Sequence, residues 1–72
     1  MRAFYIDLAE NKSDLRSAMM LAMRVGAEKI ILIGSNAEME QQLRGTGHLI
    51  EVLPVGSKIP EDAARARPRL TR

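Results

Sequence analysis

The sequence predicts an α/β fold in which three parallel strands alternate with two helices. Residues 30–33 form an unbroken apolar run that ends abruptly in Gly34-Ser35-Asn36, as expected of a strand buried on both faces. Residues 3–8 alternate between more and less apolar side chains, which is typical of a strand with one better-buried face. Between these strands the apolar residues recur at helical spacing, so we expect a β-α-β-α-β order with right-handed crossovers.

The composition fits one small folded domain. The chain has 72 residues, of which 46% are hydrophobic, and it has no cysteine, so it must be stabilised by packing within the chain or against a second copy. Residues 1–57 carry six basic and seven acidic side chains, whereas residues 58–72 carry five basic and two acidic ones. We therefore expect a domain over residues 1–67 and a basic, frayed C-terminus over residues 68–72.

The apolar stretches are also informative about location. None approaches the length needed to cross a bilayer, and Met1-Arg2 leads straight into a strand pattern without the apolar segment of a signal peptide. We expect a cytoplasmic protein with no membrane partner.

The first helix is predicted over residues 14–25. Asn11 or Ser13 is expected to cap it, with Asp14 in its first turn, and Gly26 is expected to end it. One broad apolar face is formed by Leu15, Ala18, Met19, Ala22, Met23 and Val25. Met20 and Leu21 fall outside this face and flank Ser17 and Arg24. A helix that covers a sheet with one apolar face does not need these two additional apolar side chains.

The second half of the chain repeats the pattern. Ser35 and Glu38 match a capping box for a second helix, whose thin apolar stripe is Met39 and Leu43. The third strand is predicted over residues 48–55, with Pro54 indicating a sheet edge or a strand end. Pro60 is well placed to begin a short C-terminal helix that Pro68 ends.

Two strand orders fit these elements. In order 3-2-1 the second strand is central and both helices cover one face of the sheet, whereas in order 2-1-3 the first strand is central and the helices lie on opposite faces. The all-apolar second strand favours order 3-2-1. That order leaves the other sheet face bare unless a second subunit or the C-terminal helix covers it. With Met20 and Leu21 as interface residues, we expect a homodimer; the alternative is that the C-terminal helix covers this face.

The pattern around residues 26–34, GAEKIILIG, is similar to many Rossmann-like domains and to consecutive units of (β/α)₈ barrels. This resemblance implies the architecture of a Rossmann-like half over about the first 57 residues. It implies no function, because it rests on a pattern that unrelated activities share.

A ligand site is expected at the carboxyl edge of the sheet, where loops and helix N-termini converge. Two loops there share the order strand, glycine, serine, polar residue, and such a loop before a helix suits a phosphate or carboxylate. The candidate ligand-binding residues are Asp7, Asn11, Gly34, Ser35, Asn36, Gly56, Ser57 and Lys58. The alternative is that the two glycines make turns and the two serines cap helices, since no phosphate-binding glycine motif is present.

Other chemistry has less support in the sequence. Asp7 has no convincing second acid, and His48, the only histidine, has no neighbour at metal-ligand spacing, so we assign no catalytic residue, no metal and no cofactor. The arginine-rich tail suggests nucleic-acid binding through Arg65, Arg67, Arg69 and Arg72. Against this, the sequence has no aromatic residues near the tail on which bases could stack.

The sequence therefore predicts a small, self-associating α/β binding module, with a small anionic ligand at the sheet edge, that is not an enzyme. One alternative is an enzyme subunit or fragment whose site is completed across an oligomer. The other is nucleic-acid binding through the tail.

Overall fold

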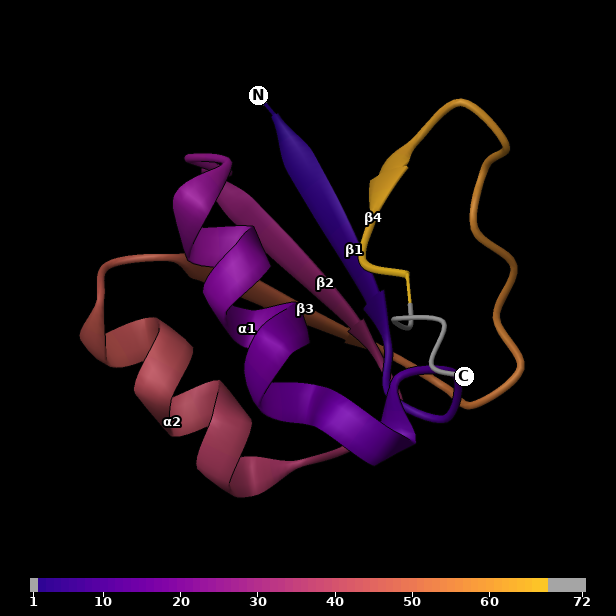
Figure 1. The fold of residues 1–72 in the computed structure, drawn as a ribbon, viewed down its shortest axis with the longest axis horizontal. Helices are drawn as coiled ribbons and strands as arrows, with labels where there is room; N and C mark the ends of the chain where they lie inside the picture. Colours follow the sequence, from indigo (N-terminus) through magenta and orange to yellow (C-terminus); the bar gives the residue numbers. More distant parts are fainter. Residues whose placement is uncertain (1, 68–72) are drawn as a thin grey trace, which may run out of the picture.

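The computed structural model describes residues 2–67 and shows a four-stranded parallel sheet with two α-helices on one side (Figure 1). In chain order the elements are β1 (Ala3–Asp7), the short 3₁₀ helix η1 (Lys12–Asp14), α1 (Leu15–Arg24), β2 (Lys29–Ile33), α2 (Ala37–Gly45), β3 (Leu49–Leu53) and β4 (Ala64–Arg65). The strand order is β3-β2-β1-β4. The predicted α/β class and the preferred order 3-2-1 are confirmed, with a fourth strand added beside β1.

Strand β2 is the centre of the sheet. Ile30 lies between Phe4 of β1 and Ile50 of β3, and each following β2 residue is flanked in the same way. The side chains of Ile30, Ile31, Leu32 and Ile33 are all buried. The apolar run therefore forms a strand covered on both faces, as predicted.

The main core lies between the helices and the sheet. Ala18 and Ala22 of α1 and Met39 and Leu43 of α2 pack on the sheet side chains of the same cluster, which include Phe4, Ile6, Ile30 and Leu32. The two small alanines let α1 approach the sheet closely. The buried face of α1 is narrower than predicted, because Met23 and Val25 are exposed.

The predicted C-terminal helix is wrong. Residues 60–63 form turns, and Ala64–Arg65 pair with Phe4 and Tyr5 as a parallel strand. The Ala66 N–H then donates to the Tyr5 carbonyl at 2.9 Å, and the Ala66 side chain joins the core. Although the sequence favours a helix locally, the strand satisfies backbone groups along the outer edge of β1 that a helix would leave unpaired.

The segment 54–63 connects the two outer strands of the sheet. It carries the chain from β3 at one edge to β4 at the other, and most of it runs past the outer edge of β4 (Figure 1). Ile31 and Ile33 point to the side of the sheet opposite the helices and are only 6% and 1% exposed. These two side chains are thus covered within the chain, but not by the C-terminal helix that the alternative to the dimer required.

Both helices are capped by residues other than those predicted. Asp14, and not Asn11 or Ser13, caps α1 by accepting a hydrogen bond from the Ser17 N–H at 3.1 Å. Asn36 caps α2 by accepting one from the Met39 N–H at 3.0 Å, so the capping box of Ser35 and Glu38 is also wrong. Asp14 directly follows the predicted cap Ser13 and lies three residues after Asn11, whereas Asn36 directly follows Ser35.

Within residues 2–67, neither helix is long and apolar enough to span a membrane.

Candidate functional site

The carboxyl edge of the sheet brings together loops that follow all four strands. Asp7 ends β1 there, and its carboxylate accepts hydrogen bonds from the N–H groups of Ala9 at 3.1 Å and Glu10 at 3.4 Å. These bonds hold the turn after β1 in place. The Asp7 carboxylate therefore has a structural role in this turn.

Asn11 is the buried polar residue of this edge. Its side chain is 3% exposed, and its amide nitrogen donates to the carbonyl oxygens of Asp7 at 3.0 Å and Ala66 at 3.5 Å. It thereby joins the loop after β1 to the chain that follows β4. Because both acceptors belong to the backbone, Asn11 fixes the shape of the edge.

The loop before α2 is built as a turn and a cap. The Gly34 N–H donates to the Leu53 carbonyl at 2.9 Å, Asn36 caps the helix, and Ser35 is exposed. The first turn of α2 also carries Glu38 and Glu40. Their negative charges oppose an anion at this helix N-terminus, so the geometry does not favour this loop as an anion site.

The loop over Gly56, Ser57 and Lys58 does not open a helix. Ser57 turns back on the loop, since its N–H donates to the Pro54 carbonyl at 3.1 Å and its hydroxyl to the same oxygen at 2.6 Å. Lys58 is exposed. The two loops therefore resemble each other in sequence but not in structure, because the loop at Gly56 lacks the helix dipole that would attract an anion.

The arginines of the tail are separated by the fold. Arg65 is partly buried and forms an ion pair with Glu10 at 2.7 Å. Its Nε atom is buried without a hydrogen-bond partner. Arg67 is exposed and forms no ion pair within residues 2–67. Arg69 and Arg72 lie outside the described residues, so nucleic-acid binding through the tail stays a prediction. Arg65 supports it less than the sequence suggested, because its charge is already paired with Glu10.

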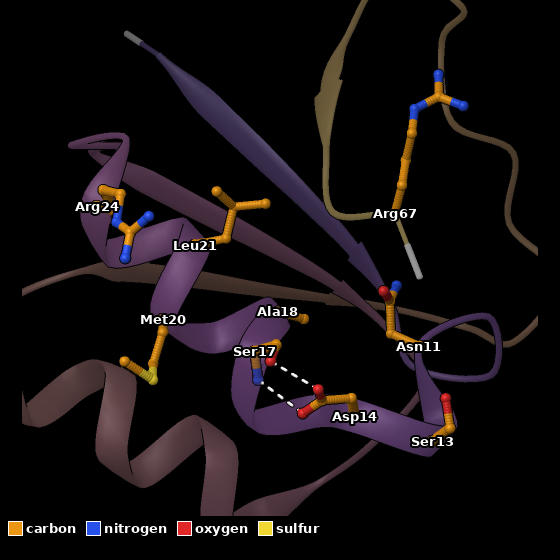
Figure 2. Close-up of a pocket in the computed structure, with 9 residues that line it drawn as sticks. All are labelled: Asn11, Ser13, Asp14, Ser17, Ala18, Met20, Leu21, Arg24 and Arg67. Atoms are coloured by element: carbon orange, nitrogen blue, oxygen red, sulfur yellow. Dashed lines mark hydrogen bonds between the residues drawn. The ribbon is translucent and has the colours of Figure 1, made fainter. Parts of the chain in front are cut away.

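A cavity of about 310 Å³ lies beside α1, between this helix and the chain after β4 (Figure 2). The sheet has four strands, whereas the helix layer has only two helices, and no helix covers β4. The cavity therefore occupies the uncovered end of the helix layer. Its lining residues are Asn11, Ser13, Asp14, Ser17, Ala18, Met20, Leu21, Arg24 and Arg67.

The cavity combines apolar and charged groups. Figure 2 shows Arg24 at one end of α1, Ser13 and Asp14 at the other, and Arg67 across from the helix, with its guanidinium group pointing away from α1. Met20 and Leu21 lie along the helix between these ends, with the Met20 side chain pointing toward α2. The Asp14 carboxylate is occupied by Ser17, whose hydroxyl donates to it at 2.6 Å. Two arginines against one acid give the lining an excess of positive charge.

A second cavity, of about 420 Å³, lies between α1 and α2. It is lined by Leu15, Arg16, Met19, Asn36, Glu38, Met39 and Gln42. One cation and one acid balance each other here, so an anion would gain less in this cavity than beside α1.

The cavity beside α1 shares only one residue with the predicted ligand-binding site. Asn11 is the one predicted ligand-binding residue that lines it, together with Met20 and Leu21, which the sequence assigned to an oligomer interface, and Arg67 of the tail. Sequence reasoning assigned no ligand-binding role to Ser13, Ser17 or Arg24. A signal was present, since Ser17, Met20, Leu21 and Arg24 recur at helical spacing on one flank of α1, outside its core face.

The described residues provide no group of three or more histidine, cysteine, aspartate or glutamate side chains that could hold a metal ion. His48 contacts Thr46 instead, with its Nδ1 atom 2.7 Å from the threonine hydroxyl. In comparisons with known proteins, no family model, no curated protein and no solved structure matches this chain.

Proposed function

We propose that this protein is a cytoplasmic binding module, and not an enzyme, which takes a small amphipathic anion into the cavity beside α1. The observation that supports this proposal is the composition of the lining, which includes the apolar side chains of Met20 and Leu21 and two arginines without ion-pair partners among residues 2–67. The ligand class is a carboxylate or phosphate monoester with a short apolar part.

The size of the cavity supports a small ligand. A volume of about 310 Å³ is near the lower end of the range that small-molecule sites occupy. Apolar surface and charge contribute differently to binding such a molecule. Met20 and Leu21 favour burial of its apolar part, whereas Arg24 and Arg67 select for negative charge.

The test is ligand-dependent thermal stability of the full chain with three probes: hexanoate, inorganic phosphate and hexylamine. Hexanoate carries both required features, phosphate lacks the apolar part, and hexylamine has the opposite charge. We expect hexanoate alone to raise the midpoint of unfolding clearly, since a ligand at a hundred times its dissociation constant adds about 2.7 kcal/mol of stability.

Variants then locate the site. Replacing Arg24 or Arg67 with Gln is expected to weaken hexanoate binding roughly two- to fivefold each, because both guanidinium groups are exposed to solvent. Lys58→Gln is the matched control in the loop that the sequence favoured. Loss of binding in Lys58→Gln, with both arginine variants unchanged, would overturn the cavity in favour of that loop.

A further inference from the structure

Strand β3 forms an open edge of the sheet. It pairs with β2 on one side, and no other strand among the described residues lies on its outer side. Leu49 and Val52 of this strand are 55% and 43% exposed, which is high for apolar side chains in a sheet. An exposed apolar edge strand is a template for pairing with another strand.

The backbone shows which groups face outward. The Leu49 N–H donates to the Glu28 carbonyl at 3.2 Å, and the Leu53 carbonyl accepts from the Gly34 N–H at 2.9 Å. Since backbone groups alternate sides along a strand, those of Leu49, Glu51 and Leu53 point to β2. Those of Ile50 and Val52 point away from the sheet, where an added strand would lie.

Both ends of this outer edge are closed. The His48 N–H already donates to the Leu43 carbonyl at 3.2 Å, and Pro54 has no N–H. The N–H groups available to a partner between residues 48 and 54 are therefore those of Ile50 and Val52. A partner strand can extend the ladder over β3 but not beyond it.

We propose that β3 pairs with β3 of a second copy of this chain, antiparallel and about a two-fold axis at Glu51. The sequence of the strand, Leu-Ile-Glu-Val-Leu, has the same chemical order in both directions. In this register Leu49 lies opposite Leu53 of the second copy, and Ile50 lies opposite its Val52. The Ile50 and Val52 pairs are the hydrogen-bonded ones, so each copy donates two N–H groups and accepts two.

The register follows from the side chains. Moving the two-fold axis to Ile50 or to Val52 keeps outward groups opposite one another, but it places Glu51 against a leucine. With the axis at Glu51, every apolar side chain of the strand has an apolar partner. The self-complementary order of the strand is what selects a second copy as the partner, since a two-fold interface brings the same surface together twice.

In this register the two Glu51 side chains lie opposite each other at the two-fold axis, and their repulsion destabilises the pairing only in part. Like charges directly opposite each other weaken a strand pair. Here, however, each copy supplies its own counter-charge, because Lys29 forms an ion pair with Glu51 within the subunit. The two lysines balance the two glutamates on the same face of the extended sheet.

Sedimentation of the full chain over a concentration series tests the proposal. We expect the mass to double from 8.0 kDa and to rise no further, since the two-fold interface is closed. Val52→Lys should keep the chain folded by circular dichroism but leave it monomeric over the whole series. Val55→Lys, at an exposed position beyond Pro54, is the matched control and should dimerise normally.

Amide exchange identifies the edge directly. Protection of the Ile50 and Val52 N–H groups should increase with protein concentration and should not do so in Val52→Lys. A chain that stays monomeric throughout the series would overturn the proposal. So would a dimer that Val52→Lys leaves intact and that Leu21→Lys on α1 dissociates, because the interface would then be the helix surface.

Discussion

The side-chain amide of Asn11 donates a hydrogen bond to the carbonyl oxygen of Ala66, 55 residues later in the chain. The same amide nitrogen donates to the Asp7 carbonyl, and Asn11 is buried. One side chain thereby holds the end of β1, the turn that leads into α1 and the segment after β4. These segments also bound the cavity beside α1, so the shape of the proposed site depends on Asn11.

Asn11→Ala is expected to lower the free energy of unfolding by roughly 1–3 kcal/mol, because it leaves two carbonyl oxygens without this donor in a buried place. Urea denaturation measures the loss. Hydrogen exchange should also become faster at the Ala66 N–H, which bonds to Tyr5. Ser13→Ala in the same turn is the control, with little change expected because Ser13 is exposed and does not cap the helix.

Gly34→Ala is expected to destabilise the fold by roughly 1–3 kcal/mol, since the residue has a φ of +111° that L side chains rarely adopt. A Cβ atom there would also come within 3.4 Å of the Leu8 side chain. Thermal unfolding compares this variant with Gly45→Ala. Gly45 lies in α2 and has open space around it, so alanine should raise stability by up to ~1 kcal/mol. Equal effects at the two glycines would contradict this account of the turn.

Asn36→Ala should cost about 1 kcal/mol of stability, because it removes the cap that receives the Met39 N–H. Ser35→Ala should change stability by less than about 0.5 kcal/mol, since Ser35 is exposed and makes no cap. Chemical denaturation of the two variants distinguishes the observed cap from the capping box that the sequence suggests. A larger loss at Ser35 would show that the box forms in solution.

The helix caps show which features of this fold the sequence patterns predict and which they do not. The apolar run at Ile30–Ile33 predicts its strand and the strand order, because covering both of its faces leaves few arrangements open. The predicted cap of α2 is wrong by one residue, since Ser35 and Asn36 are both good capping residues and the choice between them depends on backbone geometry that the sequence pattern does not specify.

The tail and the cavity were missed for a different reason, since both depend on contacts between distant parts of the chain. Residues 60–67 have helical preferences, but the pairing of Ala64 and Arg65 with β1 residues 60 positions earlier in the sequence outweighs them. The cavity exists because β4 extends the sheet beyond the helix layer. Arg67 is brought to it by that extension, whereas Arg24 lies on α1, and neither residue belongs to a local motif.

Ile33→Val and Ile30→Val test whether the segment 54–63 packs on the sheet. Ile30 points to the helices and Ile33 to the opposite side, and both are buried. If the segment covers its side of the sheet well, removing one methylene should cost roughly 0.5–1.5 kcal/mol at either position. Val55→Ala, at an exposed position, is the control and should change stability by less than about 0.5 kcal/mol. A loss at Ile33 as small as that of the control, beside a normal loss at Ile30, would mean that this side is open in solution and free to receive a partner.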